Sequence, residues 1–270
     1  MIVSNYRIPY NLGDTIKLKP MFDVHCGHKD CDLLAFKKFM AESDDKTYFI
    51  GGGDLIDAII AKDIRRYRKS GDATKGDAVI DEQLDIIYDI LKPYSKRIIG
   101  LAAGNHEDSI LKYCGTDPTN RLCKMLSDDT YTIKYLGYSC LIKLLFHENG
   151  GRGRSVVIRE HHGWGGGSRT RGADLTKFEK DMGKWDADIY LYGHVHKKQT
   201  DKMPRLGMSG KTLIARPQLL CICGTFEKTY SNTTDPTYAE TKGFPPTEIG
   251  GVTINMKPLS HGWVDLSAVT

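Results

Sequence analysis

The chain has 270 residues, of which 40% are hydrophobic and 27% charged, and its formal net charge is +4. These proportions are those of ordinary globular proteins, so they exclude a collagen-like or wholly disordered chain. The mildly basic balance allows an anionic ligand, but it falls short of the strong positive charge typical of nucleic-acid-binding domains.

Targeting and redox signals are weak throughout the sequence. No run approaches the roughly 18 apolar residues of a membrane helix, and the first residues, MIVSNYRIPYNLGD, do not resemble an export signal. The seven cysteines lack paired CxxC spacing, which favours reduced thiols over a zinc knuckle or a disulfide framework. We therefore expect a cytoplasmic protein that has no membrane partner.

Strand-like and helical runs alternate along the first half of the chain. Apolar spacing and breakers predict strands over 17–25 and 47–54, helices over 31–42, 55–69 and 78–92, and then a strand, a glycine and polar residues over 97–108. Pro20 indicates an edge position or a bulge in the first strand, and Pro93 stops the last helix.

The second half continues this alternation and then becomes irregular. The predicted elements are a hairpin of strands over 139–146 and 155–163, a helix over 173–182, a strand over 188–196, one or two strands over 212–226, and an irregular segment over 230–250. The chain contains no strong linker. We predict one α/β domain over residues 1–270, with a motif core at 16–200 followed by C-terminal strands and an irregular tail at 201–270.

Polar residues collect where the predicted strands end. They are Asp23, His25, Asp54, Asn105, His106, His161, His162, His194 and His196. Sites in open α/β sheets form outside the carboxyl ends of the strands, so these distant residues are expected to converge on one crevice. In an extended chain, side chains two apart project to the same face, which would let DVH and HVH each present two ligands.

The residue types at these strand ends select a class of metal. Imidazole, carboxylate and amide oxygen without thiolate suit Mn, Fe, Co, Ni or Zn. Seven ligands drawn from these nine side chains are too many for one tetrahedral ion and fit two ions that share a carboxylate. A lone DxH or HxH is a weak signal, but six of the nine histidines lie in these five ordered segments. The combination therefore predicts metal binding.

The same five segments resemble the calcineurin-like metallophosphoesterase superfamily, whose pattern runs DxH, GDxxD, GNH[ED], a strand-end His and GHxH. Here they read DVH (23–25), GDLID (53–57), GNHED (104–108), HHG (161–163) and GHVH (193–196). The segment HHGWGGGSRTRGADL is similar, more loosely, to the glycine-rich loop of phage and prophage members. The resemblance implies a four-layer α/β/β/α sandwich of two mixed β-sheets flanked by helices.

The resemblance also implies a role for each matching residue. The first metal would be held by Asp23, His25 and His196, and the second by Asn105, His194 and one of the paired histidines. Members with an HG pattern use the His directly before Gly, which favours His162 over His161. Asp54 would bridge the two divalent ions, for which Mn²⁺ is preferred and Fe, Zn, Ni or Co are alternatives. His106 would be catalytic, stabilising or protonating the leaving oxygen.

This set predicts hydrolysis of a phosphomonoester or phosphodiester substrate by a hydroxide that bridges two metals. Arg169 and Arg171 follow the glycine run and suit phosphate binding, with solvated loop arginines as the alternative. The basic run at 62–69 is a solvated face or a nucleic-acid contact. A nuclease acting on DNA or RNA is the enzymatic alternative. A non-catalytic metal-binding scaffold is the other, and it is disfavoured because every ligand position is filled.

Overall fold

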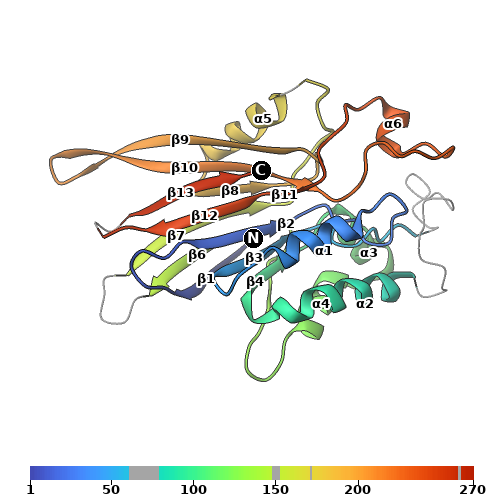
Figure 1. The fold of residues 1–270 in the computed structure, drawn as a ribbon, viewed down its shortest axis with the longest axis horizontal. Helices are drawn as coiled ribbons and strands as arrows, with labels where there is room; N and C mark the ends of the chain where they lie inside the picture. Colours follow the sequence, from blue (N-terminus) through green and yellow to red (C-terminus); the bar gives the residue numbers. More distant parts are fainter. Residues whose placement is uncertain (61–78, 148–152, 171, 261–262) are drawn as a thin grey trace.

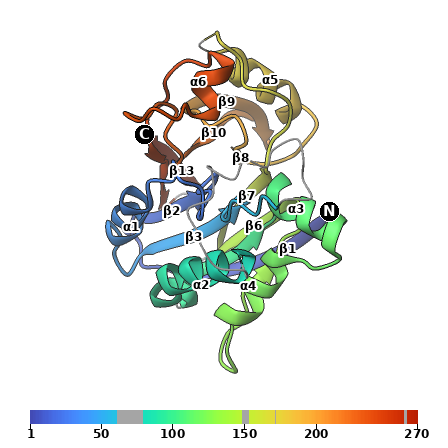
Figure 2. The ribbon, with the colours of Figure 1, turned by 90° about the vertical axis from the view of Figure 1, so that its right-hand side faces the viewer.

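Two mixed β-sheets packed face to face form the centre of the molecule, and helices cover their outer faces (Figures 1 and 2). The computed structural model describes residues 1–60, 79–147, 153–170, 172–260 and 263–270. The described residues form helix, sheet, sheet and helix layers, so the predicted α/β/β/α fold class is confirmed.

Each sheet combines strands from both halves of the chain. In the seven-stranded sheet the order is β1 (Ile2–Pro9), β6 (Ser139–His147), β7 (Arg154–His161), β8 (Ile189–Tyr192), β10 (Thr212–Thr225) and β11 (Gly250–Gly251), with β9 (Lys198–Ser209) paired to β10. In the six-stranded sheet the order is β13 (Val264–Val269), β12 (Thr253–Pro258), β2 (Ile16–Met21), β3 (Thr47–Gly52), β4 (Ile98–Ala102) and β5 (Lys134–Tyr135). Parallel pairing of β2, β3 and β4, and of β7 and β8, brings the carboxyl ends of these strands to common edges.

Strand alternation explains the long apolar runs of the central strands. In β3, Ile50 faces the core between the two sheets, whereas its neighbour Phe49 faces the helices. In β8, Leu191 faces the inter-sheet core and Tyr192 packs beneath α5 (Ala173–Met182). Because both faces of these two strands are buried, their sequences do not alternate between apolar and polar residues.

Three helices of the described residues match those predicted over 31–42, 78–92 and 173–182, and the other helices were not predicted from the sequence. The helices are α1 (Leu33–Ala41), α2 (Val79–Leu91), the 3₁₀ helix η2 (Lys92–Arg97), α3 (Asn105–Cys114), α4 (Pro118–Leu126), α5 and the short α6 (Tyr238–Lys242). Asp32 caps α1 by accepting the N–H of Ala35 at 2.9 Å. Pro93 lies at the start of η2, directly after α2. No helix in the described part of the chain has the length and apolar character needed to cross a membrane.

The helix predicted over Leu55–Lys69 is wrong for its described part, Leu55–Ile60, which forms no helix. Side chains from other elements bind the backbone amides there: Glu107 accepts the N–H groups of Leu55 and Ile56, and Gln83 accepts that of Ala58. These tertiary bonds hold the segment in irregular conformation. Residues 61–69, including the whole basic run at 62–69, lie outside the described residues.

The C-terminal part of the chain is more regular than the sequence indicates. The span predicted as one or two strands forms one long strand, β10 (Thr212–Thr225), whose hairpin with β9 extends beyond the body of the sheets (Figure 1). The strand β12 pairs with β2, and β13 pairs with β12 to form the edge of the second sheet. Pro20 lies in the part of β2 that pairs with β3 alone, because the pairing with β12 covers only Ile16–Leu18. The hairpin of β6 and β7 is confirmed.

Candidate metal centre

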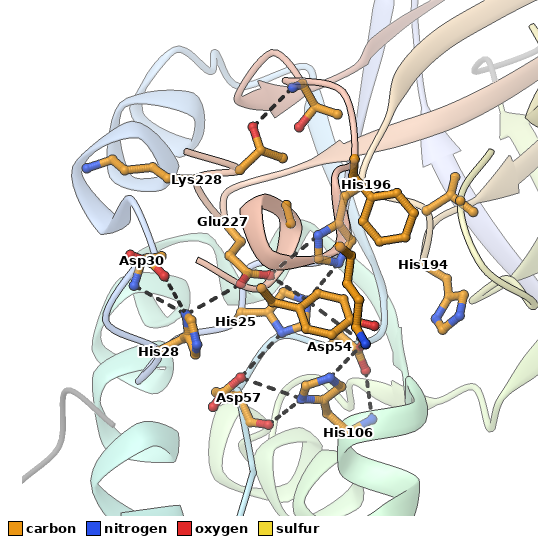
Figure 3. Close-up of a pocket in the computed structure, with 18 of the residues that line it drawn as sticks. His25, His28, Asp30, Asp54, Asp57, His106, His194, His196, Glu227 and Lys228 are labelled. Atoms are coloured by element: carbon orange, nitrogen blue, oxygen red, sulfur yellow. Dashed lines mark hydrogen bonds and ion pairs between the residues drawn. The ribbon is translucent and has the colours of Figure 1, made fainter. Parts of the chain in front are cut away.

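The turns after β2, β3, β4 and β8 line one cavity of about 540 Å³ at an end of the two sheets (Figure 3). Predicted site residues from all four turns face it: His25, Asp54, Asn105, His106, His194 and His196. Asp23 and His162 are not among the lining residues and are completely buried, in contact with residues that are. The five sequence segments therefore meet in space.

A first cluster consists of Asp23, His25 and His196. The Nε2 atoms of the two histidines are 3.1 Å apart, and Asp23 Oδ1 lies 3.9 Å from that of His25 and 3.8 Å from that of His196. Burial lowers the pKa of both histidines, so both rings are neutral and able to act as ligands. Asp23 Oδ1 is buried and accepts no hydrogen bond. A cation between these atoms would satisfy all three.

A second cluster consists of Asp54, Asn105, His162 and His194. Asn105 Oδ1 lies 2.7 Å from His194 Nδ1 and 3.0 Å from His162 Nε2. Asp54 Oδ2 is 3.2 Å from the same His162 nitrogen. Two imidazole nitrogens, an amide oxygen and a carboxylate oxygen thus point at one small volume. That donor set suits a divalent transition metal.

Asp54 stands between the two clusters. Its Oδ2 faces His162 of the second cluster and lies 3.9 Å from His25 Nε2 of the first. Its Oδ1 accepts the backbone N–H of His106 at 2.9 Å, which fixes the orientation of the carboxylate. This is the placement that a bridging ligand requires.

Hydrogen bonds behind the clusters decide which atoms are presented. His162 Nδ1 lies 3.0 Å from the carbonyl oxygen of Gly52, so that nitrogen carries the proton and Nε2 is left as the ligand atom. Asp23 Oδ2 accepts the N–H of His194 at 2.7 Å, which leaves Oδ1 for the first cluster. His161 lies apart from both clusters, and its Nδ1 accepts the N–H of Gly163 at 2.9 Å.

The backbone at the site is strained. Asp23, His25, Asp54, His194 and His196 have φ values of 49°, 51°, 51°, 70° and 54°. The extended-chain rationale for DVH and HVH is therefore wrong, because these residues lie in left-handed turns after the strands. Such conformations cost non-glycine residues about 1 kcal/mol or more each and cluster at functional sites. The side chains converge through these turns.

Glu107 braces the turn that carries Asp54. One of its carboxylate oxygens accepts the N–H groups of Asp54 and Gly104, each at 2.9 Å, and the other accepts those of Leu55 and Ile56 at 2.8 and 3.3 Å. Gly104 is required here, because a Cβ on it would lie 2.0 Å from Asp54 Oδ1. Glu107 belongs to GNHED, so a sequence signal existed for it.

The cavity is also lined by polar residues that were not singled out from the sequence. Asp57 Oδ1 lies 3.6 Å from the Nδ1 atoms of both His25 and His106, and its place in GDLID was a signal. Glu227 Oε2 lies 3.4 Å from His196 Nδ1, and its Oε1 lies 3.4 Å from His28 Nδ1 (Figure 3). No motif marks Glu227 or His28, since tertiary folding alone brings them to the site.

The electrostatics of the site displace several pKa values. Burial, together with the Asp54 charge, raises the pKa of Asp23 to about 8. Burial disfavours a charged His162, but the carboxylates of Asp54 and Asp23 outweigh it and raise the His162 pKa to about 10, so a metal ion at Nε2 would have to displace a proton. Burial and His162 lower the pKa of His194 to about 4. Shifts of this size at converging groups are typical of functional sites.

The predicted arginines are not part of the clusters. Arg169 is exposed, lies outside the described residues that line the cavity, and donates from Nη2 to the carbonyl oxygen of Lys242 at 3.0 Å. It therefore links the glycine-rich segment to the segment that contains α6. Arg171 lies outside the described residues.

The sequence matches no family model and no curated protein. Among solved structures, the chain is similar to a Vps29 from Entamoeba histolytica complexed with zinc, at 16% identity over 94% of this chain and 98% of that chain, with a TM-score of 0.36. It is also similar to a Vacuolar Protein Sorting 29 from Cryptosporidium parvum, at 14% identity, 94% and 97% coverage and a TM-score of 0.37.

A third similar structure is a conserved uncharacterized protein, a predicted phosphoesterase, from Streptococcus pneumoniae TIGR4. It is 13% identical, with coverage of 95% of this chain and 99% of that chain and a TM-score of 0.31. At these scores the likeness is too weak to support an inference about function.

Proposed function

We propose that the protein is a calcineurin-like metallophosphoesterase that hydrolyses phosphoester bonds with the help of two divalent metal ions. The observation that carries this proposal is the position of Asp54, whose carboxylate faces one cluster of imidazoles through His162 and the other through His25. A single carboxylate between two such clusters is the arrangement that a dinuclear centre needs.

The residues present fit two metal ions. Asp23, His25 and His196 would hold the first, Asn105, His162 and His194 the second, and Asp54 both. Asp23 Oδ1, buried and without a hydrogen bond, would gain the partner that it lacks. Bound divalent ions of this kind lower the pKa of water and stabilise negative charge on phosphoryl oxygens.

His106 is positioned to donate a proton to the leaving oxygen of a substrate. Its Nδ1 contacts the carbonyl oxygen of Asp57 and lies 3.6 Å from the carboxylate of the same residue, which fixes the ring. Its Nε2 lies 3.9 Å from Asp54 Oδ2, on the side of the dinuclear site. A proton on Nε2 can therefore pass to the leaving oxygen of a phosphoester held there.

Turnover of two simple substrates after metal removal tests the proposal. We expect chelator-treated protein to be inactive and Mn²⁺ to restore hydrolysis of p-nitrophenyl phosphate, of bis(p-nitrophenyl) phosphate, or of both. The ratio of the two rates gives the preference for monoesters or diesters. A protein that binds two equivalents of Mn²⁺ and hydrolyses neither ester would be a metal-binding scaffold, and the proposal would fall.

A further inference from the structure

A closed loop, residues 229–247, forms one wall of the cavity above the metal clusters. Its ends are joined by the bond from the Thr247 N–H to Thr229 Oγ1 at 3.1 Å. Within it, Tyr230 donates its hydroxyl to the Phe244 carbonyl at 2.7 Å, and the buried Thr237 donates to the Thr229 carbonyl. Long loops that are closed by their own hydrogen bonds are frequently functional.

Tyr238 lies at the rim of the cavity on this loop. It lines the cavity, and at 58% exposure it is the most exposed aromatic side chain in the described part of the chain. Its backbone is fixed, because the preceding Thr237 caps α6 by accepting the N–H of Glu240 at 3.1 Å. The ring lies 6.3 Å from that of Phe244, edge-tilted rather than stacked. The fold thus holds a flat aromatic surface at the mouth of the site.

Another stretch of the wall is bare backbone. Gly165, Gly166 and Gly167 line the same cavity, and the first two have open space where a Cβ would stand. The bond from Arg169 to the Lys242 carbonyl joins this stretch to the loop that carries Tyr238. The lining of the cavity therefore includes the Tyr238 ring and a stretch of glycine backbone that has no side chains.

Two of the three lysines in the described lining of the cavity are paired with carboxylates. Lys29 pairs with Asp235, and Lys228 Nζ lies 3.4 Å from Asp32, so both lysines are compensated. Lys242, the remaining lysine of the cavity lining, has its Nζ 5.8 Å from the centroid of the Tyr238 ring. Tyr238, with Lys242 beside its ring, is therefore a group at the rim that could contact the part of a substrate beyond its phosphate.

We propose that Tyr238 stacks on the base of a nucleotide-type phosphoester whose phosphate lies at the metal clusters. This inference rests on the proposed function and narrows its substrate class. The cavity of about 540 Å³ is within the range of pockets that hold whole small molecules, and it is larger than a phosphate needs. Stacking on one aromatic side chain tolerates any base. The site would therefore select nucleotides without distinguishing one base from another.

Two ligands that differ only by the base test the proposal. Metal-loaded protein is titrated calorimetrically with adenosine 5′-monophosphate and with ribose 5-phosphate, and phosphate release is measured in the same samples. We expect the nucleotide to bind about 5- to 150-fold more tightly, the range for one stacked base. Tyr238→Leu should bring the ratio within about twofold of unity and leave ribose 5-phosphate unaffected. Tyr238→Phe should keep the ratio.

Tyr113→Leu is the matched control, since Tyr113 is also an exposed tyrosine but lies outside the cavity lining. Equal affinities of the two ligands for the wild-type protein, no binding of either, or a ratio that survives Tyr238→Leu would overturn the proposal. Binding does not require turnover. If esters are not hydrolysed but the ratio of the two affinities behaves as expected, the proposed function fails and the base site stands. If esters are hydrolysed but the two ligands bind equally, only the base site is refuted.

Discussion

The carboxylate of Glu107 is the main brace of the turn that carries Asp54, and Glu107→Gln isolates its contribution. Each carboxylate oxygen accepts two backbone N–H groups, so both oxygens act as acceptors in the folded protein. The amide nitrogen of Gln would face two of those N–H groups and leave them buried without acceptors. At about 1–3 kcal/mol for each unsatisfied group, the loss in the free energy of unfolding is about 2–6 kcal/mol. Total stability of about 5–15 kcal/mol would survive most of this range.

Urea unfolding of the metal-free protein measures this loss, with Asp108→Asn as the control. Asp108 is the next residue, is exposed, lies in the first turn of the same helix, and loses the same charge. Its substitution should cost only about 0.3–1 kcal/mol, the usual helix-dipole contribution. The reasoning would be refuted if Glu107→Gln cost no more than Asp108→Asn, because the four backbone bonds would then not depend on the carboxylate.

Three further predictions concern the metal centre. His106→Ala should retain metal and lower turnover by about 10²–10⁴-fold, as elemental analysis and kinetics would show; loss of metal would count against its assignment as a proton donor. Asp54→Asn should lose activity and at least one metal ion, unlike the surface change Asp45→Asn, and full occupancy with two ions would contradict a bridging role. In the metal-free protein, Asp23 and His162 have folded pKa values of about 8 and about 10, above their ordinary values of 3.8 and 6.5. The folded state therefore keeps protons that the unfolded chain has lost, so its melting temperature should fall from pH 7 to pH 9 in the presence of chelator, and a rise would refute these shifts.

Local features of the fold were predictable because they depend on nearby residues. The helix over 173–182 is observed as Ala173–Met182, since its apolar spacing is local. The end of α2 follows from Pro93, which cannot continue a helix. The failure at Leu55–Ile60 has the opposite cause, because Glu107, about 50 residues away in the sequence, binds the amides of that segment.

Chemical identity came from the sequence, whereas geometry came from tertiary structure. The types of residue at the strand ends indicated a metal site before any fold was known, because imidazole, carboxylate and amide oxygens at such places share few other purposes. The HG pattern favoured His162 over His161, but only the folded chain shows the reason, since the His162 ring meets Asn105 and Asp54 across the sheets and the His161 ring does not. Only folding brings Glu227 to the clusters, because contacts between distant segments leave no periodic trace in a sequence.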